Sequence, residues 1–359
     1  MTAERMPWWA WTWPVVAWVV LLSALLVGLG GPMAAAAGAI LIATVFAAVY
    51  HAEVVAHRVG EPFGTLVLAI AVTVIEVALI VSVMVAAAGE KAGLARDTVF
   101  AAVMIVMNGI VGLCLLWGGA RHHEQGFQVQ GASAALAVLA ALTTLTLVLP
   151  NLVASMPGPG FSTSQLVFAG IVSLVLYGAF VFIQTVRHRD YFLPIEAADE
   201  DAHAPPPSKR MAAASVGLLL VALVAVVALA KPLTPTLEVV IAWLGLPKAV
   251  IGIVIAAIVL LPEVLAALKA AQANRLQTSL NLALGSTLAA IGLTIPAVAA
   301  VSIVLGQPLE LGLGEKDRLL LALTLFVGVI TLGTGRTTVL QGAVHLVIFG
   351  AFLFFAVVP

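Results

Sequence analysis

Long apolar stretches, separated by short polar or proline- and glycine-rich segments, make up most of this chain. About 20 apolar residues in a helix are enough to cross the hydrocarbon core of a bilayer. The apolar residues are continuous and do not alternate with polar ones, so the stretches indicate helices and not the strands of a barrel. Eleven stretches lie roughly at residues 13–30, 33–50, 63–88, 98–118, 131–149, 164–186, 211–230, 249–268, 278–305, 319–333 and 338–358. We therefore expect an all-α polytopic membrane protein with about 11 transmembrane helices.

Two segments at the margins of this pattern need separate interpretation. Residues 236–246 (TLEVVIAWLGL) are too short to span a bilayer, and we expect them to form a surface helix between two spans. The first stretch follows Arg5 and precedes small residues near 34–38, which is also the pattern of a signal peptide. The four tryptophans within residues 8–13 favour instead an anchor at the membrane interface.

The composition agrees with a membrane protein. Of the 359 residues, 62% are hydrophobic and 9% are charged, and the mean hydropathy is +1.16. A soluble domain has about a quarter of its residues charged. The net charge of −1 and the scattered Lys and Arg residues exclude a nucleic-acid partner, so membrane lipid is the expected surrounding. These features do not indicate an oligomeric state.

The positive charges predict the orientation, because Lys and Arg are enriched in cytoplasmic loops. Ten of the 16 Lys and Arg residues fall on the N-terminal side of the membrane when the stretches are followed in order. We therefore expect a cytoplasmic N-terminus and a C-terminus on the outside.

The order of the stretches predicts an internal repeat. Residues 1–30 hold a leading helix, residues 31–186 and 211–359 hold five helices each, and residues 187–210 form an acidic, proline-rich cytoplasmic linker. Because five is odd, the second group enters the membrane from the side opposite to the first. Two five-helix repeats of inverted topology are typical of secondary transporters.

Two carboxylates stand alone inside otherwise apolar stretches. Glu76 lies at the centre of 63–88 and Glu263 lies in 249–268, each in the second stretch of its repeat. An ionised side chain near the bilayer midplane is costly, so such residues usually belong to ion or proton pathways. A protonated, purely structural glutamate is the alternative. The matching positions indicate instead a functional pair that binds a cation or protons and that the inversion brings together.

Neighbouring groups on the same helices are candidate ligands. Thr73 lies one turn before Glu76 on the same helix face, although its hydroxyl has the alternative of bonding its own backbone. Pro262 has no amide hydrogen, which leaves the carbonyl of Ile258 without its helical donor. A free carbonyl beside a carboxylate is a hard-oxygen cation ligand, and a simple kink is the alternative.

Other polar residues are candidates for the ion or proton pathway. Asn108 and Ser286 lie inside apolar stretches, where linking of helices or packing of small residues is the alternative. His51, Glu53 and His57 end the second stretch at the expected cytoplasmic mouth. Because histidine titrates near neutral pH, these three residues are a candidate proton relay. A solvated helix end is the alternative.

At these residues the chain resembles the calcium/cation antiporter superfamily, and within it the bacterial calcium/proton exchangers of the Cha type. In the family's first repeat an acidic residue closes one span and a Gly-Asn-Ala-Thr-Glu motif occupies the next. Residues 52–80 are similar to this repeat, with Glu53 and Glu76 on its two acids. The Gly-Asn pair reads Val72-Thr73 here, so an amide oxygen that the general family offers is missing.

The resemblance continues through the second half of the chain. Residues 250–268 and 281–296 are similar to the family's second repeat, with Glu263 on its glutamate and Ser286 within a match to its Gly-Ser-Ser-Leu. The Gly-Asn pair is again replaced, here by apolar residues. Residues 335–342 (GRTTVLQG) are similar to the family's C-terminal motif. By the order of the spans the resemblance covers nearly the whole chain.

The resemblance implies a secondary active transporter that exchanges calcium for protons by alternating access, with no cofactor, in a bacterial inner membrane. A pair of carboxylates holds one divalent cation or two protons, so protons displace the cation. Because two amide oxygens are missing, exchange of sodium or potassium for protons is the alternative. In the family an acidic helix that can bind calcium occupies the place of the 187–210 linker, and a disordered linker is the other interpretation.

Two further classes of protein are disfavoured. A cation channel is a remote alternative, since it needs a ring of pore ligands. An intramembrane metal hydrolase needs His and Glu at metal-site spacing within the spans, and this spacing is absent from the sequence.

Overall fold

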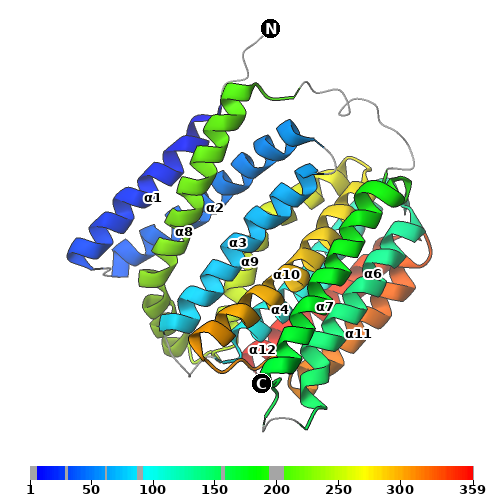
Figure 1. Cartoon of the computed structure of the whole chain (residues 1–359). Helices are drawn as coiled ribbons and strands as arrows, with labels where there is room; N and C mark the ends of the chain where they lie inside the picture. The colour runs from blue at the N-terminus through cyan, green and yellow to red at the C-terminus, as the bar shows by residue number, and fades with distance from the viewer. Residues whose placement is uncertain are drawn as a thin grey trace. The chain divides into compact units, whose positions relative to one another are not determined.

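The computed structural model of this chain describes residues 6–28, 31–60, 63–86, 92–154, 158–193 and 206–358. Helices account for nearly all of these residues, as Figure 1 shows. The strands named in this part of the chain are two dipeptides, β1 (Gln125–Gly126) and β2 (Arg336–Thr337), which pair with each other. The fold is therefore the all-α fold that the apolar stretches predict. Half of the 187–210 linker, residues 194–205, lies outside the described residues.

Each of the eleven predicted stretches coincides with one helical segment. The segments are α1 (Trp8–Val27), α2 (Gly31–Val59), α3 (Phe63–Ala86), α4 (Leu94–Met104) with η1 (Ile105–Ile110) and α5 (Val111–His122), α6 (Val129–Thr143) with η2 (Thr144–Val148) and η3 (Leu149–Asn151), α7 (Thr163–Phe182) with η4 (Ile183–Arg187), α8 (Lys209–Trp243), α9 (Val250–Gln272), α10 (Leu276–Leu305), α11 (Glu315–Leu332) and α12 (Val339–Val357). A short 3-10 helix, η5 (Arg189–Phe192), follows η4.

Nine of these segments are, within the described residues, long and apolar enough to cross a membrane. In α3 the range Ile70–Ser82 is apolar within the described residues, and the sequence of the helix carries Glu76 as its one charged residue. The first turn of α11 carries the four charged residues 315–318. Because charged side chains are costly in hydrocarbon, we place this turn at the membrane surface and the apolar remainder of α11 within the bilayer.

The expectation of a separate surface helix at 236–246 is wrong. Residues 236–243 continue α8, which runs without a break from Lys209 to Trp243 through Pro232 and Pro235. Proline removes one helical hydrogen bond but is tolerated in membrane helices, where neighbouring groups satisfy the freed backbone. The two prolines therefore lie inside α8 and do not end it.

The described chain divides into two compact units that cut across the predicted repeats. One unit comprises Met1–Ala88 and Asp199–Ile251, and the other comprises Gly89–Ala198 and Gly252–Pro359. Each unit thus takes helices from both halves of the sequence. Glu76 belongs to the first unit and Glu263 to the second.

In the first unit α2 packs against α1, α3 and α8. Small buried side chains on α2, such as Ala37, Ala48 and Ala52, allow this close packing. Pro14 inside α1 leaves the carbonyl of Ala10 without a helical donor, and His51 of α2 donates to that carbonyl from Nε2 at 3.0 Å. A polar side chain of one helix thus satisfies a backbone group that a proline frees in another.

In the second unit two pairs of helices pack closely, each at a glycine. α5 packs on α12, where a Cβ at Gly342 would lie 2.3 Å from the Leu116 nitrogen. α10 packs on α7, where a Cβ at Gly292 would lie 2.7 Å from the Tyr177 Cβ. Glycine at these positions lets the helix backbones approach closely, which is how membrane helices associate.

The two ends of the second unit are built alike. At one end β1, which follows α5, pairs with β2, which precedes α12, with Gln125 opposite Thr337. At the other end Glu310, after α10, forms an antiparallel bridge with Gly160, before α7. In the predicted repeats α5 and α10 are equivalent, as are α12 and α7. Two repeats of opposite orientation would produce this arrangement.

Candidate functional site

Glu76 lies in the buried face of α3 within the first unit. Its side chain is 3% exposed, and Ile75, Leu79 and Ile80 beside it are buried as well. α3 packs against α2 and α8 of the same unit. The structure therefore buries this carboxylate within the first unit.

Thr73 lies one turn before Glu76 and is also buried, at 7% exposure. Its hydroxyl has no hydrogen-bond partner among the described residues. Buried threonines elsewhere donate to the carbonyl four residues earlier, for example Thr234 to Ala230 at 3.0 Å. The alternative in which Thr73 bonds its own backbone does not hold, so its oxygen is available to a ligand. A buried hydroxyl left unbonded costs about 1–3 kcal/mol.

Glu263 lies on α9 in the second unit, directly after Pro262. Its side chain is partly buried, and its Oε2 is shielded from solvent. Pro262 lies inside the helix, so the Ile258 carbonyl lacks its i+4 donor, as the sequence predicts. At the start of α9, a Cβ at Gly252 would lie 2.9 Å from the Asp97 carbonyl carbon, so α9 begins in close contact with α4.

The C-terminal end of α9 is held by side chains that the sequence interpretation missed. His122 donates from Nε2 to the Gln272 carbonyl at 3.0 Å, and Gln125 donates from Nε2 to the Ala271 carbonyl at 3.0 Å. Helix-terminal carbonyls lack intrahelical donors. The only sequence signal was a run of polar residues after an apolar stretch, which is also the pattern of an ordinary loop.

Ser286 of α10 has a hydroxyl that is shielded from solvent and has no hydrogen-bond partner among the described residues. A Cβ at the preceding Gly285 would meet no described atom within 4 Å. Thr287, by contrast, donates to the Ala283 carbonyl at 3.0 Å. Tight packing therefore does not account for the glycine at 285.

Asn108 links three helices. It lies in the π-helical turn η1, where its Oδ1 accepts from His345 Nδ1 of α12 at 3.1 Å and its Nδ2 donates to Thr324 Oγ1 of α11 at 2.8 Å. His345 Nε2 lies 3.2 Å from Thr331 Oγ1. All four side chains are buried. Because both ends of the amide are bonded, this geometry favours the helix-linking alternative for Asn108.

The structure does not assemble His51, Glu53 and His57 into one relay. His51 is fully buried and bonds Ala10 of α1 and, at 3.2 Å, the Ser215 hydroxyl of α8. Glu53 and His57 are exposed. His51 therefore joins helices, whereas Glu53 and His57 share the exposed side of α2.

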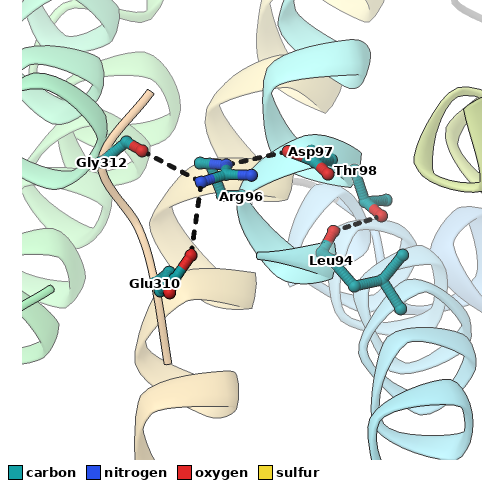
Figure 2. A network of polar contacts seen from close by, with 6 residues as sticks. All are labelled: Leu94, Arg96, Asp97, Thr98, Glu310 and Gly312. Carbon is teal, nitrogen blue, oxygen red and sulfur yellow. Dashed lines mark hydrogen bonds and ion pairs between the residues drawn. The ribbon is translucent and has the colours of Figure 1, made fainter. Parts of the chain in front are cut away.

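A charged cluster lies where α4 begins in the second unit. Arg96 donates from Nε to Asp97 at 2.8 Å and from Nη1 to the Gly312 carbonyl at 3.1 Å, and it lies 3.8 Å from Glu310 (Figure 2). Burial, with a smaller contribution from the Asp97 carboxylate, raises the pKa of Asp317 in the surface turn of α11.

Among the described residues no group of three or more His, Cys, Asp or Glu side chains is placed to hold a metal ion.

Comparison with known proteins identifies the family. The family model described as sodium/calcium exchanger protein matches residues 31–186 and 214–358. A putative ionic transporter, y4hA of Sinorhizobium fredii, is 52% identical over 363 residues, covering 99% of this chain and 98% of the relative. The sodium-potassium/proton antiporter ChaA of Escherichia coli is 37% identical, covering 87% of this chain and 85% of the relative.

Solved structures share the fold. The crystal structure of the selenium-substituted Ca2+/H+ antiporter protein YfkE has a TM-score of 0.73 and 15% identity, covering 98% of this chain and 99% of that one. The family consists of transporters, so the enzyme and channel alternatives are set aside. The chain is a cation/proton antiporter that belongs to the sodium/calcium exchanger protein family.

Proposed function

We propose that this antiporter exchanges calcium for protons and that Glu76 and Glu263 carry the exchange. The observation that carries the proposal is a buried glutamate in the membrane helix α3, at 3% exposure, with a second glutamate at the matching helix of the other repeat. An ionised carboxylate buried in a membrane span is costly, so a bound cation or proton would stabilise it.

The chemistry follows from counting charge. Two ionised carboxylates balance one divalent cation, and two protonated carboxylates are neutral. Loss of the cation leaves like charges in a medium of low dielectric constant, which favours protonation. The conformational change that moves the site across the membrane is costly while both carboxylates are ionised and hold no ligand. The protein therefore exchanges the cation for protons, which is antiport.

Neutral oxygens would complete the coordination. The unbonded hydroxyl of Thr73 and the Ile258 carbonyl freed by Pro262 are suitable, because hard cations prefer oxygen ligands. Ser286, whose hydroxyl is also unbonded, is a third candidate. We assign Asn108 and His51 to helix linking, because their polar atoms are bonded to neighbouring helices.

Exchange of sodium or potassium for protons is the second candidate. The Escherichia coli relative, which is named a sodium-potassium/proton antiporter, supports it. The two missing amide oxygens, one at residues 72–73 and one at residues 259–260, also favour a cation that needs fewer ligands than calcium. Calcium is supported by the two carboxylates, whose charge matches a divalent ion.

The membrane placement is proposed from the charges. The chain is a multi-pass membrane protein with bacterial relatives. We infer a bacterial inner membrane with the N-terminus in the cytoplasm, because ten of the 16 Lys and Arg residues fall on that side.

Ion-dependent proton flux in proteoliposomes tests the function. Purified protein would be reconstituted with a pH-sensitive dye inside, and gradients of calcium, sodium or potassium would be applied outside. If calcium drives proton release at a lower concentration than sodium or potassium does, calcium exchange is supported. A response to sodium or potassium with none to calcium would establish the second candidate instead.

A further inference from the structure

The last turn of α9 is tied to the segment that follows α5. The carbonyls of Lys269, Ala270 and Ala271 accept from backbone amides just after the helix, whereas the Gln272 carbonyl accepts from His122. A carbonyl only accepts, so His122 Nε2 carries the hydrogen. The end of α9 is thus capped by side chains from another part of the chain.

Gln125 makes the more extensive contact. Its Nε2 donates to the Ala271 carbonyl and to Asn274 Oδ1, both at 3.0 Å. Asn274 adopts a left-handed conformation, with φ of 60°, where the chain leaves α9. One amide group therefore fixes both the end of α9 and the turn that follows it.

Gln125 is itself held in place. Its side chain is 3% exposed, and its backbone pairs with Thr337 in the two-stranded sheet. A Cβ at Gly118 of α5 would overlap with the Gln125 amide, so glycine at 118 leaves room for this side chain in its present rotamer. The amide thus projects toward α9 from a rigid support.

The part of α9 held in this way contains Glu263. Pro262 removes one hydrogen bond between the two halves of the helix, which weakens their mechanical coupling. Glu263 lies on the C-terminal side of this break, eight residues before Ala271. That separation is about 12 Å along a helix axis, so a small tilt at the end of α9 moves the carboxylate.

We propose that Gln125, with His122, is a positioning residue for cation exchange that fixes the helix end carrying Glu263. The inference rests on the proposed role of Glu263 and adds residues outside the apolar core to it. Partners hydrogen-bonded directly to a metal ligand usually cost about 10–100-fold in metal affinity when they are removed, and we expect the low end of this range because Gln125 acts through the helix end. We expect Gln125→Met, which keeps the length but loses both donors, to raise the cation KM about tenfold at unchanged maximal rate per folded protein.

The test measures transport and helix position separately. Spin labels at Leu265→Cys on α9 and Phe168→Cys on α7, both exposed positions of the second unit, report their distance in a Cys114→Ala background. Gln125→Met should change or broaden this distance and raise the KM. Gln130→Met, the same change at an exposed position of α6, should do neither.

The outcomes separate this inference from the proposed function. An unchanged label distance in Gln125→Met overturns the inference, and so does a changed distance with an unchanged KM. Glu263→Gln, measured alongside, then decides the proposed function by itself: loss of exchange supports it, and retained exchange overturns it. If Gln125→Met does not fold, His122→Phe and His122→Gln take its place, because only glutamine retains a donor for the Gln272 carbonyl. Equal KM values for these two variants would overturn the inference.

Discussion

Among single residues, chemically similar side chains inside the apolar helices turn out to have different surroundings. Thr73 and Asn108 are both polar residues within apolar stretches. The Thr73 hydroxyl has no partner among the described residues, whereas Asn108 uses both ends of its amide to join η1 to α11 and α12. Residue type alone therefore does not separate a candidate ligand from a helix link.

Neutralising either central glutamate should abolish exchange. Glu76→Gln and Glu263→Gln remove the charge that holds the cation while keeping the side-chain shape, so folding should be retained. Because exchange needs both charges, the double variant should be no worse than either single one. Flux in proteoliposomes is the measurement, and Glu315→Gln, at a side chain that is 96% exposed, is the control. Near-normal exchange by either single variant would contradict the proposal.

Thr73→Val should separate function from stability. The hydroxyl makes no hydrogen bond, so replacing it with a methyl group should leave stability unchanged or raise it by about 1 kcal/mol. The cation KM should rise a few-fold, because one neutral ligand and no charge is lost. Thr234→Val is the control, since it breaks a bond to Ala230 and should lower stability without changing the KM. A KM for Thr73→Val equal to wild type would remove Thr73 from the site.

At the level of helices and their contacts, packing depends on small residues and on groups that prolines free. The carbonyl of Ala10, freed by Pro14, is bonded by His51 of α2. The sequence shows Pro14 and His51 as separate features, and only packing brings them together. The same holds for the last turn of α9, which accepts from His122 and Gln125.

Glycine in the contact between α5 and α12 is expected to be essential for folding. A Cβ at Gly342 would lie 2.3 Å from the backbone nitrogen of Leu116, so Gly342→Ala must push the two helices apart. Thermal unfolding in detergent should show a lower Tm or a loss of folded protein. Gly178→Ala, where a Cβ meets no described atom within 4 Å, should leave the Tm unchanged or raise it. Equal Tm values for the two variants would show that this contact is looser than the structure indicates.

Across the whole chain, the family match over residues 31–186 and 214–358 has nearly the bounds of the two predicted repeats. The compact units of the structure divide the chain differently, because each contains helices of both halves. The order of the apolar stretches shows the two repeats, whereas packing decides which helices form one compact unit. The inverted orientation of the repeats stays a prediction.

Labelling of single cysteines tests that orientation. In a Cys114→Ala background, Glu124→Cys should react with a membrane-impermeant thiol reagent only from the cytoplasmic side, and Gln307→Cys only from the outside. These positions follow equivalent helices of the two repeats, α5 and α10. Reaction of both from the same side would exclude the inverted repeat.

Competition between calcium and protons tests the mechanism as a whole. Protonation removes the charge that holds the cation, so calcium affinity should fall as pH falls through the range where the carboxylates titrate. With two protons per calcium, the affinity should fall by up to about 100-fold per pH unit, at about 1.4 kcal/mol for each tenfold change. Calorimetric titration at several pH values provides the measurement. An affinity independent of pH would mean that protons take another route.

The amino-acid sequence alone specifies the helices and the unusual residues among them. A continuous apolar stretch in lipid forms a helix, because its backbone groups must bond one another. A lone glutamate in such a stretch is easily recognised, because its charge is costly there. In the one misassigned segment, residues 236–243 continue α8 through Pro232 and Pro235, because proline is tolerated in membrane helices. The folded chain was needed to show that His51 and Asn108 join helices, that the Thr73 hydroxyl stays unbonded and that Gln125 caps α9. Hydrogen bonds between residues far apart in sequence depend on distances in space, which a linear pattern does not contain.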